Sequence, residues 1–592
     1  MKIEVGNVKR LFDILPHQSL YHPKEDSLCD KIGGSWRKYS SQNLEQIVNK
    51  MSLGFLNLGL NPTDKVAIIS YNRTEWTIVD LSVLQFGGVD VPLYPTMNKE
   101  NYEYILNDSQ VKIVFVENDI LFEKIKSILP RTPSVKEIYT FNHVGGAKHW
   151  SEVYAINGEN FNSQLEEYKN AVTEENLATI IYTSGTTGTP KGVELTHKNI
   201  LSNVKSIQAS MPHSSEHTML SFLPICHIFE RAAVYFYMYI GGSVYFAEGI
   251  EKVGDNLREV RPHYFTTVPR LIEKIYDRIM EKGRTLSGAK KAIFFWAVNH
   301  ANNFNPEGKN NFIYNIKLKI ARKLVFSKWI EALGGNVIGI ISGAAALQPR
   351  LARIFSAAGV PICEGYGLTE TSPVLTCNRF EEGKYFLGTV GLAIPDVEIK
   401  IAENGEILAK GPNVMNGYHN LPDATKTSID ADGWFHTGDV GEIINGKFLK
   451  ITDRLKEIFK TSGGKFVAPL PIENKIKESN FITEIMVVGE NQKHPAAIIV
   501  PNFDFIKKWG EKKSLTFNSN QEICASQDVK NKIFEEVEKF NQRFDHTQQI
   551  KKIELIFDTW GVETGELTPT LKLKRKILVE KYKYIIEKIY SE

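Results

Sequence analysis

The sequence has few cysteines and almost no net charge. Its 592 residues include five cysteines, an odd number, and none of them forms a CxxC pair. This pattern argues against a disulfide scaffold or a zinc site and is typical of a reducing compartment. Lysine and arginine number 71, aspartate and glutamate 69, and the formal net charge is +2. Without an overall basic field, the composition predicts no nucleic-acid partner.

Long hydrophobic runs are also missing. The beginning, MKIEVGNVKRLFDIL, carries charged residues where a signal peptide needs an apolar core. The most apolar stretch, residues 232–247, is shorter than the roughly 18 residues of a membrane span. It is also interrupted by Gly241, Gly242 and Ser243, which predicts a buried helix followed by a strand. We therefore expect a soluble or peripheral protein, in the cytoplasm or on the inner face of a membrane.

The length excludes a single hydrophobic core, because such cores stop growing at about 250–300 residues. Short apolar runs alternate with amphipathic helical runs along most of the chain. The expected strand–helix pairs are 66–70 with 76–86, 178–182 with 196–210, and 336–342 with a helix that begins near Pro349. Thr196 is the expected N-cap of the second helix. Such alternation predicts an α/β fold of mainly parallel sheets with crossover helices.

The pattern changes after about residue 453. Two short strands within residues 484–500 predict a smaller α+β unit. We therefore expect a large N-terminal domain, residues 1–453, and a small mobile C-terminal domain, residues 454–592. Within the large domain, residues 257–333 are expected to form a long helical insertion rather than another βα unit.

The strongest motif is YTSGTTGTPKGV at residues 182–193, directly after a predicted strand. Its glycines, hydroxyl side chains and lysine offer close backbone N–H groups, short donors and one cation to a polyphosphate. It differs from a Walker A loop, because Lys191 stands between Pro190 and Gly192. Four hydroxyl side chains among six residues near a lysine argue against a flexible loop without function. The candidate phosphate-binding residues are Thr183, Ser184, Gly185, Thr186, Thr187, Gly188 and Lys191.

This motif resembles the phosphate-loop signature of the acyl-adenylate-forming superfamily, which includes acyl-CoA synthetases, luciferases and adenylation domains. Three further motifs follow in the family's order and at similar separations: EGYGLTET at 364–371, GWFHTGD at 433–439 and TDRLK at 452–456. With weaker similarity on either side, the resemblance covers most of the chain from about Val66 onward. Four motifs in order make the resemblance specific.

The resemblance implies roles for five residues of these motifs. Glu370 would hold Mg²⁺, a hard cation that suits one carboxylate together with phosphate oxygens, and Thr369 would lie near the α-phosphate of ATP. Tyr366 would stack on the adenine. Asp439 would accept hydrogen bonds from the ribose hydroxyls, and Arg454 would reach the same ribose.

The same resemblance implies a hinge and a catalytic lysine. Lys456 falls at the hinge position, where one backbone rotation swings the small domain between two half-reactions. The segment LTPTLKLKRKIL at 567–578 resembles the catalytic-lysine segment of long-chain fatty acyl-CoA synthetases and puts Lys572 at the catalytic position. Leu571 replaces a glycine that is common in the family, so Lys574 stays as the alternative. The rest of the KLKRK run is expected to form a solvated basic face.

Three further segments resemble the long-chain fatty acyl-CoA synthetases. They are LPICHIFERA at 223–232, VPRLIEKIYDRI at 268–279 and KTSGGKFVAPLPIE at 460–473. By this resemblance His227 lies beside the acyl carboxylate and the phosphate loop. Gly463 and Gly464 match the loop that faces the pantetheine tunnel of CoA after the domain rotates.

Two segments leave more than one interpretation open. Small residues at Gly343 and at 344–346 provide room for an acyl chain, but close helix–sheet packing explains them equally well. Residues 315–329 (NIKLKIARKLVFSKW) mix basic and apolar residues at helical spacing. They fit either a contact with anionic lipid or a solvated helix face.

Together these features predict a long-chain fatty acid–CoA ligase. The fatty carboxylate attacks the α-phosphate of ATP to give acyl-AMP and pyrophosphate, and the CoA thiolate then displaces AMP. ATP and CoA are the expected co-substrates, Mg²⁺ is the expected cofactor, and no enzyme nucleophile is needed, which agrees with the lack of a GxSxG motif. Rival interpretations are a fatty acyl-AMP ligase that loads a carrier protein, a luciferase-like oxidase, and a catalytically silent module that binds nucleotide or fatty acid.

Overall fold

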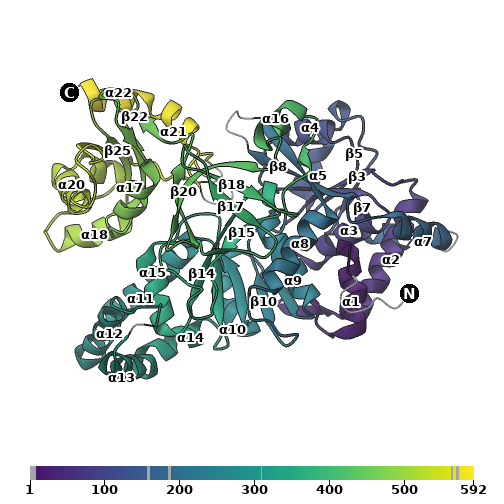
Figure 1. Cartoon of the computed structure of the whole chain (residues 1–592), viewed down its shortest axis with the longest axis horizontal. Coiled ribbons are helices and arrows are strands. Elements are labelled where there is room, and N and C mark those ends of the chain that lie inside the picture. The colour runs from purple at the N-terminus through teal and green to yellow at the C-terminus, as the bar shows by residue number, and fades with distance from the viewer. Residues whose placement is uncertain are drawn as a thin grey trace.

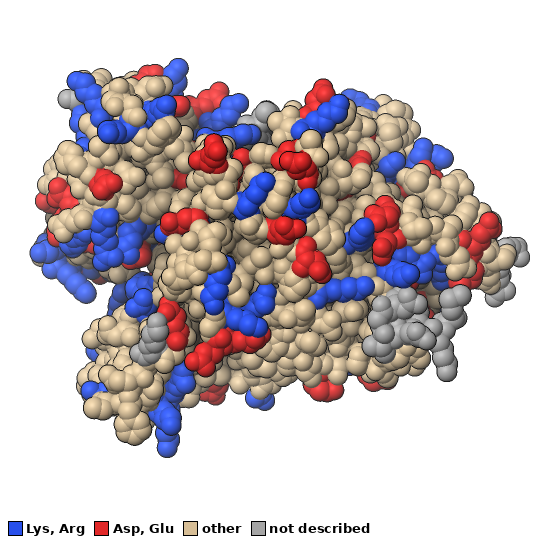
Figure 2. All heavy atoms as spheres, in the orientation of Figure 1, with Lys and Arg blue, Asp and Glu red and all other residues tan. Residues whose placement is uncertain are grey.

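The structure, a computed structural model, describes residues 8–155, 161–184, 189–308, 310–561, 564–568 and 572–591. These residues form a large lobe and a smaller lobe, and the smaller lobe comes from the C-terminal part of the chain (Figure 1). Charged residues of both signs are interspersed over the face shown in Figure 2. This distribution agrees with the near-zero net charge.

The first large sheet lies in the middle of the large lobe. In spatial order its strands are β16 (Leu392–Ala393), β15 (Val374–Cys377), β14 (Ile362–Gly367), β13 (Gly339–Ser342), β12 (Tyr264–Thr267), β10 (Thr218–Ser221), β11 (Ser243–Phe246), β1 (Leu28–Ile32) and β2 (Ser35–Tyr39). Neighbouring strands from β14 to β1 pair in parallel, and the strands at both edges are antiparallel.

The second large sheet is also mainly parallel, with antiparallel strands at one edge. In spatial order its strands are β19 (Gly417–Tyr418), β9 (Pro190–Thr196), β8 (Leu177–Ser184), β4 (Val89–Leu93), β3 (Lys65–Ile69), β5 (Val111–Val116), β6 (Glu137–Thr140) and β7 (Lys148–His149). Strands from β8 to β7 pair in parallel, while β8, β9 and β19 are antiparallel. A third, antiparallel sheet contains β17 (Glu398–Ile401), β18 (Glu406–Lys410), β20 (Phe435–Ile444) and β21 (Phe448–Arg454).

Helices connect and cover the strands, as parallel pairing requires. The α-helices of the large lobe are α1 (Ile14–Tyr21), α2 (Ser41–Asn57), α3 (Thr74–Gln85), α4 (Lys99–Asp108), α5 (Asp119–Lys126), α6 (Ser151–Ala155), α7 (Asn162–Ala171), α8 (His197–Gln208), α9 (Ile228–Tyr239), α10 (Val253–Val260), α11 (Pro269–Thr285), α12 (Gly288–Ala301), α13 (Phe312–Ala321), α14 (Ser327–Ala332), α15 (Pro349–Ala358) and α16 (Pro422–Ser428). The predicted α/β fold is therefore confirmed.

The predicted strand–helix pairs are present as β3 with α3 and β13 with α15; β8 and α8 are also present, but the strand β9 lies between them in the sequence. The first residues of α8 show how the local sequence determines where this helix begins. Thr196 has extended backbone and its hydroxyl accepts the Asn199 N–H, while the Asn199 side chain accepts the Thr196 N–H. This reciprocal cap satisfies two backbone donors that the first helical turn leaves without partners.

The apolar stretch 232–247 forms the end of α9 and then β11, as predicted. Helix α9 is anchored by Arg231, whose side chain is 1% exposed. Its guanidinium pairs with Asp80 of α3 at 2.6 Å and Asp90 of β4 at 3.0 Å, and donates to Thr179 of β8. Buried charges need such partners, so the cluster fixes α9 against the second sheet. None of the described helices has both the length and the apolarity needed to cross a bilayer.

The prediction of a helical insertion over residues 257–333 is partly wrong. Helix α10 leads into β12, which pairs in parallel with β10 and β13 in the first sheet and therefore continues the βα pattern. All four residues of β12, YFTT, are buried, and so short a run shows no clear period. The mainly helical part begins only at Pro269 and extends through α11, α12, α13 and α14.

The smaller lobe has an α+β fold. Its strands are β22 (Phe459–Lys460) with β23 (Phe466–Val467), and β24 (Ile482–Val488), β25 (Ala496–Pro501) and β26 (Lys552–Leu555). Its helices are α17 (Pro469–Ile476), α18 (Phe503–Glu511), α19 (Asn520–Ala525), α20 (Gln527–Asn541), α21 (Arg575–Lys581) and α22 (Lys583–Ser591). The two strands predicted within 484–500 are β24 and β25. Residues 453–456 are the end of β21 and the turn after it.

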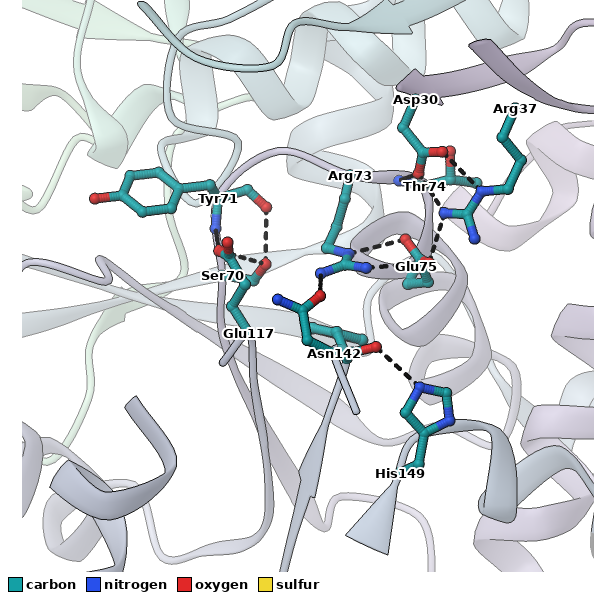
Figure 3. Close-up of polar contacts among 11 residues, drawn as sticks. Asp30, Arg37, Ser70, Tyr71, Arg73, Thr74, Glu75, Glu117, Asn142 and His149 are labelled. Carbon is teal, nitrogen blue, oxygen red and sulfur yellow. Dashed lines mark hydrogen bonds and ion pairs between the residues drawn. The ribbon is translucent and has the colours of Figure 1, made fainter. Parts of the chain in front are cut away.

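A buried ionic network fixes the start of α3 (Figure 3). Glu75, 2% exposed, lies between Arg37 and Arg73, with its oxygens 2.6 Å and 2.9 Å from their nitrogens. Asp30 also pairs with Arg37 and accepts the Thr74 N–H of the first helical turn. Burial acts to raise the pKa of Glu75, but the two guanidinium groups outweigh it and bring this pKa to about 2.

We expect Glu75→Gln to lower the free energy of unfolding at neutral pH by about 3 kcal/mol, because two partly buried guanidinium groups lose the buried carboxylate that they share. The pKa of Glu75 is lower in the folded state than its ordinary 4.5. Its stabilisation is therefore complete above pH 4.5 and is lost as the pH falls toward 2. Urea midpoints of wild type and variant should converge below about pH 4.5. A difference that stays constant down to about pH 3 would contradict this assignment.

Candidate active site

The predicted phosphate loop is the end of the β8–β9 hairpin. Thr183 pairs with Lys191 near the end of this hairpin. Lys191 Nζ lies 4.9 Å from the centre of the Tyr418 ring in β19. The turn itself, with Gly185, Thr186, Thr187 and Gly188, lies outside the described residues, as does the side chain of Ser184. The described part of the hairpin therefore contributes a cation held over an aromatic ring.

Glu370 and Thr369 lie in a single turn of 3₁₀ helix, Thr369–Thr371, directly after β14. The Tyr418 hydroxyl donates to Glu370 Oε1 at 2.9 Å, so Tyr418 contacts both Glu370 and Lys191. Burial raises the pKa of Glu370, Asp439 adds to this effect, and Tyr418 and Lys191 oppose it. The described residues contain no cluster of three or more metal-ligating side chains. A single carboxylate fits Mg²⁺, which keeps several waters and is usually bound through one or two carboxylates together with phosphates.

Asp439 and Arg454 face each other across the β20–β21 ladder. Arg454 Nε lies 3.4 Å from Asp439 Oδ1, and the Tyr366 hydroxyl donates to Oδ2 at 2.7 Å. Tyr366, on β14, is 8% exposed. The three residues that the sequence analysis assigned to the nucleoside of ATP are thus in direct contact, although they come from two different sheets.

Lys572 reaches this group from the smaller lobe. Its backbone forms two hydrogen bonds with Thr568, at 2.8 and 3.0 Å. Burial lowers the pKa of Lys572 to about 8 and Arg454 acts in the same direction, while Asp439, Glu457 and Glu370 oppose the shift. Burial also lowers the pKa of His227 to about 4, and the charge of Lys572 contributes. Lys572 is therefore close enough to Asp439, Glu370 and His227 for its charge to interact with these groups.

His227 caps helix α9, and its Nδ1 accepts the Phe229 N–H at 3.2 Å. The preceding loop, residues 221–225, is held by Asn72. The Asn72 amide donates to Ser221 Oγ and to the Leu223 carbonyl at 3.1 and 2.7 Å, and accepts the Ile225 N–H at 2.9 Å. These three hydrogen bonds fix the direction from which the chain enters α9.

The loop that presents Asn72 is itself held on both sides (Figure 3). Glu117, at the end of β5, accepts the Tyr71 N–H at 2.8 Å. Arg73 donates to Asn142 at 2.9 Å, and pairs with Glu75. Asn72 therefore projects from a loop that has little freedom to move.

Gly343 follows β13 and lies against α9. A Cβ atom at this position would come within 3.1 Å of the Phe229 ring, so the small residue is needed for close approach. Ala344 has φ +69°, a left-handed conformation that residues with a side chain rarely adopt. Such outliers cluster at functional sites.

Three predicted residues lie apart from this group. Gly463 and Gly464 form the open tip of the β22–β23 hairpin in the smaller lobe, where a Cβ atom would meet almost nothing. Figure 1 places β22 near α22, away from β14. Lys456 lies in the turn that follows β21, where the chain passes from the large lobe to the smaller one.

The expected solvated face of the KLKRK run is wrong for Arg575. Its Nη2 donates to both oxygens of Glu473, at 2.8 and 2.9 Å, and its Nη1 donates to the Val487 carbonyl. This arginine joins α21 to α17 and β24. The partner of Arg575 is Glu473, about a hundred residues earlier in the chain, and the basic run alone does not indicate this ion pair.

Sequence reasoning also missed Asn72 and Tyr418. The dipeptide Gly417-Tyr418 precedes His419 in a loop-rich stretch without a strong period, and only the pairing of β19 with β9 brings it to Lys191. Asn72 follows a predicted strand, where polar loop residues often contribute to sites in α/β proteins. The position of Asn72 directly after a predicted strand was therefore the one feature of the sequence that could have indicated its role.

Comparisons with known proteins agree with this arrangement. Residues 15–419 match the family model of the AMP-binding enzymes, and residues 456–592 match that of the AMP-binding enzyme C-terminal domain. The chain is 32% identical to the long-chain-fatty-acid–CoA ligase FadD15 of Mycobacterium bovis, covering 95% of this chain and 94% of that protein. It is also 32% identical to human long-chain-fatty-acid–CoA ligase 1, over 90% of this chain and 79% of that one.

Solved structures share the fold at lower identity. The adenylation domain of a carboxylate reductase from Mycobacterium chelonae superposes with a TM-score of 0.78 at 20% identity, covering 100% of this chain and 92% of that one. An anthranilate–CoA ligase in complex with anthranoyl-AMP superposes with a TM-score of 0.71 at 16% identity, covering 97% of each chain.

Proposed function

Because this chain belongs to the family of AMP-binding enzymes, we propose that it is a long-chain fatty acid–CoA ligase. In the first half-reaction a fatty carboxylate oxygen bonds to the α-phosphorus of ATP, the bond to pyrophosphate breaks, and acyl-AMP forms. In the second, the CoA thiolate attacks the acyl carbon and AMP leaves with the electron pair of the broken C–O bond. The observation that carries the proposal is the contact of the Asp439 carboxylate with both Tyr366 and Arg454.

Catalysis in this proposal rests on positioning and charge neutralisation, since no covalent intermediate with the enzyme is needed. Lys572 and Lys191 neutralise charge on the phosphates, and Thr369 and the loop 183–191 donate hydrogen bonds. His227 lies beside the carboxylate that attacks. Mg²⁺, when bound by Glu370, supplies further charge neutralisation at the phosphates.

We assign the nucleoside to the group formed by Tyr366, Asp439 and Arg454. The Asp439 carboxylate accepts the ribose hydroxyls, Arg454 holds that carboxylate and reaches the ribose, and the Tyr366 ring stacks on adenine. Gly343 is assigned to the same site, where its lack of a side chain lets the chain after β13 approach Phe229 of α9. The contacts among the three nucleoside residues support this assignment, because they fix both the carboxylate and the ring.

The proposed domains are residues 1–453, which bind ATP and the acyl group, and residues 454–592, which carry Lys572. Lys456 is the proposed hinge. Rotation there withdraws Lys572 after adenylation and brings Gly463 and Gly464 toward the pantetheine of CoA. Their exposed hairpin, remote from β14, supports such a second arrangement. The free cysteines fit a cytoplasmic location.

Fatty-acid-dependent exchange between ATP and labelled pyrophosphate tests the adenylation step. We expect exchange with palmitate and Mg²⁺, and none without the acid. Exchange without any thioester when CoA is added would favour a ligase that loads a carrier protein. Absence of exchange with short, aromatic and long acids would overturn the proposal in favour of a silent binding module.

Asn72→Ala should lower the rate of adenylation by about 10- to 100-fold, because a loop displaced by a fraction of an ångström misplaces His227. Binding of ATP should change little, so the effect is expected in kcat for exchange rather than in the KM of ATP. Asn107→Ala is the matched control, since it removes an amide that donates to the Arg131 carbonyl, away from the loop that presents Asn72. Equal losses in both variants would show that Asn72 acts only through stability.

A further inference from the structure

The mainly helical part of the large lobe exposes an apolar stripe. On α13 and the π-helical segment that follows it, Arg322–Phe326, five large apolar side chains face outward. Their exposed fractions are 79% for Phe312, 66% for Ile313, 44% for Ile316, 47% for Ile320 and 50% for Leu324. At about 100° per residue, these positions cover one side of the helix. A soluble surface rarely gathers so many large apolar residues in one place.

The opposite side of the same helix accounts for its folding. Leu318, Ala321, Val325 and Phe326 are buried in the core that includes α12 and α15. Because these residues already anchor the helix, folding does not require the apolar stripe. The neighbouring α12 extends the exposed surface with Trp296, which is 38% exposed.

Positive charge surrounds this stripe. Residues 288–330 contain eight lysines and arginines and a single acidic residue, Glu307. Lys317 and Lys319 are exposed and fall on opposite margins of the stripe by helical spacing. In the described part of the chain neither lysine has an ion-pair partner. Figure 1 places α12 and α13 at one end of the large lobe. In Figure 2 the surface at this end is largely uncharged, with lysine or arginine at its edge.

We propose that this α12–α13 surface docks on a lipid bilayer that carries anionic headgroups. The apolar stripe enters the boundary between headgroups and acyl chains, and the lysines at its margins contact the anionic headgroups. Trp296 suits the same interface, where an aromatic ring with a polar edge is favoured. The sequence left residues 315–329 open between a lipid contact and a solvated face, and the exposed stripe decides for lipid.

The test is co-sedimentation of the full-length protein with phosphatidylcholine vesicles, with and without phosphatidylglycerol. We expect binding to the anionic vesicles that weakens as salt increases. The double variant Ile316→Glu/Ile320→Glu should bind at least about tenfold less, and Lys317→Glu about fivefold less. Ile120→Glu on α5 is the matched control, since Ile120 is 73% exposed and Figure 1 places α5 far from α12 and α13.

Binding is measured without ATP, fatty acid or CoA, so its outcome is independent of the proposed reaction. Unchanged co-sedimentation of the double variant, beside a normal melting curve, would overturn the proposal. Equal loss in Ile120→Glu would do the same. A wild type that does not bind vesicles and is a dimer, with a monomeric double variant, would instead identify the surface as a contact between two copies.

Discussion

Lys572→Ala should lower the rate of acyl-AMP formation by about 10²- to 10³-fold, the cost of removing one preorganised charge from a transition state. Thioester formation from supplied acyl-AMP should change far less. The pentavalent phosphorus whose charge Lys572 neutralises occurs only in the first half-reaction. Lys572 is the lysine whose charge acts on His227. Measuring both half-reactions separately, by pyrophosphate exchange and by conversion of acyl-AMP with CoA, checks the expectation.

Lys574→Ala is the matched control, since it removes a positive charge two residues away in the same basic run. It should leave pyrophosphate exchange nearly unchanged. If Lys574→Ala instead gives the larger loss, the register of the segment is shifted by two residues. Equal loss of both half-reactions in Lys572→Ala would remove it from the adenylation step.

The lowered pKa of Lys572, about 8, gives this residue a pH dependence. Below that pH the ammonium is present in the free enzyme, and above it the charge is lost. The value of kcat/KM for adenylation, which reports on the free enzyme, should therefore fall as the pH rises through about 8. The residual activity of Lys572→Ala should lack this alkaline limb.

Lys456→Pro should block formation of the thioester by about 10²-fold or more while sparing adenylation, because proline fixes φ near −65° and prevents the hinge rotation. The charge of Lys572 already interacts with the proposed adenylation residues Asp439 and Glu370 in this structure, so we expect the first half-reaction to need no rotation. Single-turnover measurements of acyl-AMP formation and of acyl-CoA formation distinguish the two steps.

Lys456→Ala is the control for the hinge, since it removes the side chain and leaves φ free. It should retain most thioester formation. Normal thioester turnover in Lys456→Pro would place the hinge at another residue of the turn after β21.

Much of the fold is encoded locally. The strand–turn–helix units around β3 and β13, the strand β8 and the start of α8 follow from short apolar runs and caps such as Thr196, all of which act over a few residues. The order of strands within the two large sheets does not follow from such patterns. The strand β12 was missed for this reason, because only its neighbours β10 and β13 make its four residues a strand.

The candidate site also contains residues that the sequence indicates and residues that it does not. Lys191, Glu370, Asp439 and Lys572 stand in recognisable motifs, and the sequence therefore indicated them before the structure showed their contacts. Tyr418, Asn72 and the Arg575–Glu473 pair depend on partners far away along the chain. A single sequence carries no information about which distant residues meet, so these contacts became visible only in three dimensions.

The most direct test of the proposed function is incubation of the protein with ATP, Mg²⁺ and palmitate, with and without CoA. Palmitoyl-CoA, AMP and pyrophosphate are followed together. We expect sustained turnover only with CoA, and equal amounts of palmitoyl-CoA, AMP and pyrophosphate. No palmitoyl-CoA under conditions where acyl-AMP accumulates would contradict the assignment of CoA as the acyl acceptor.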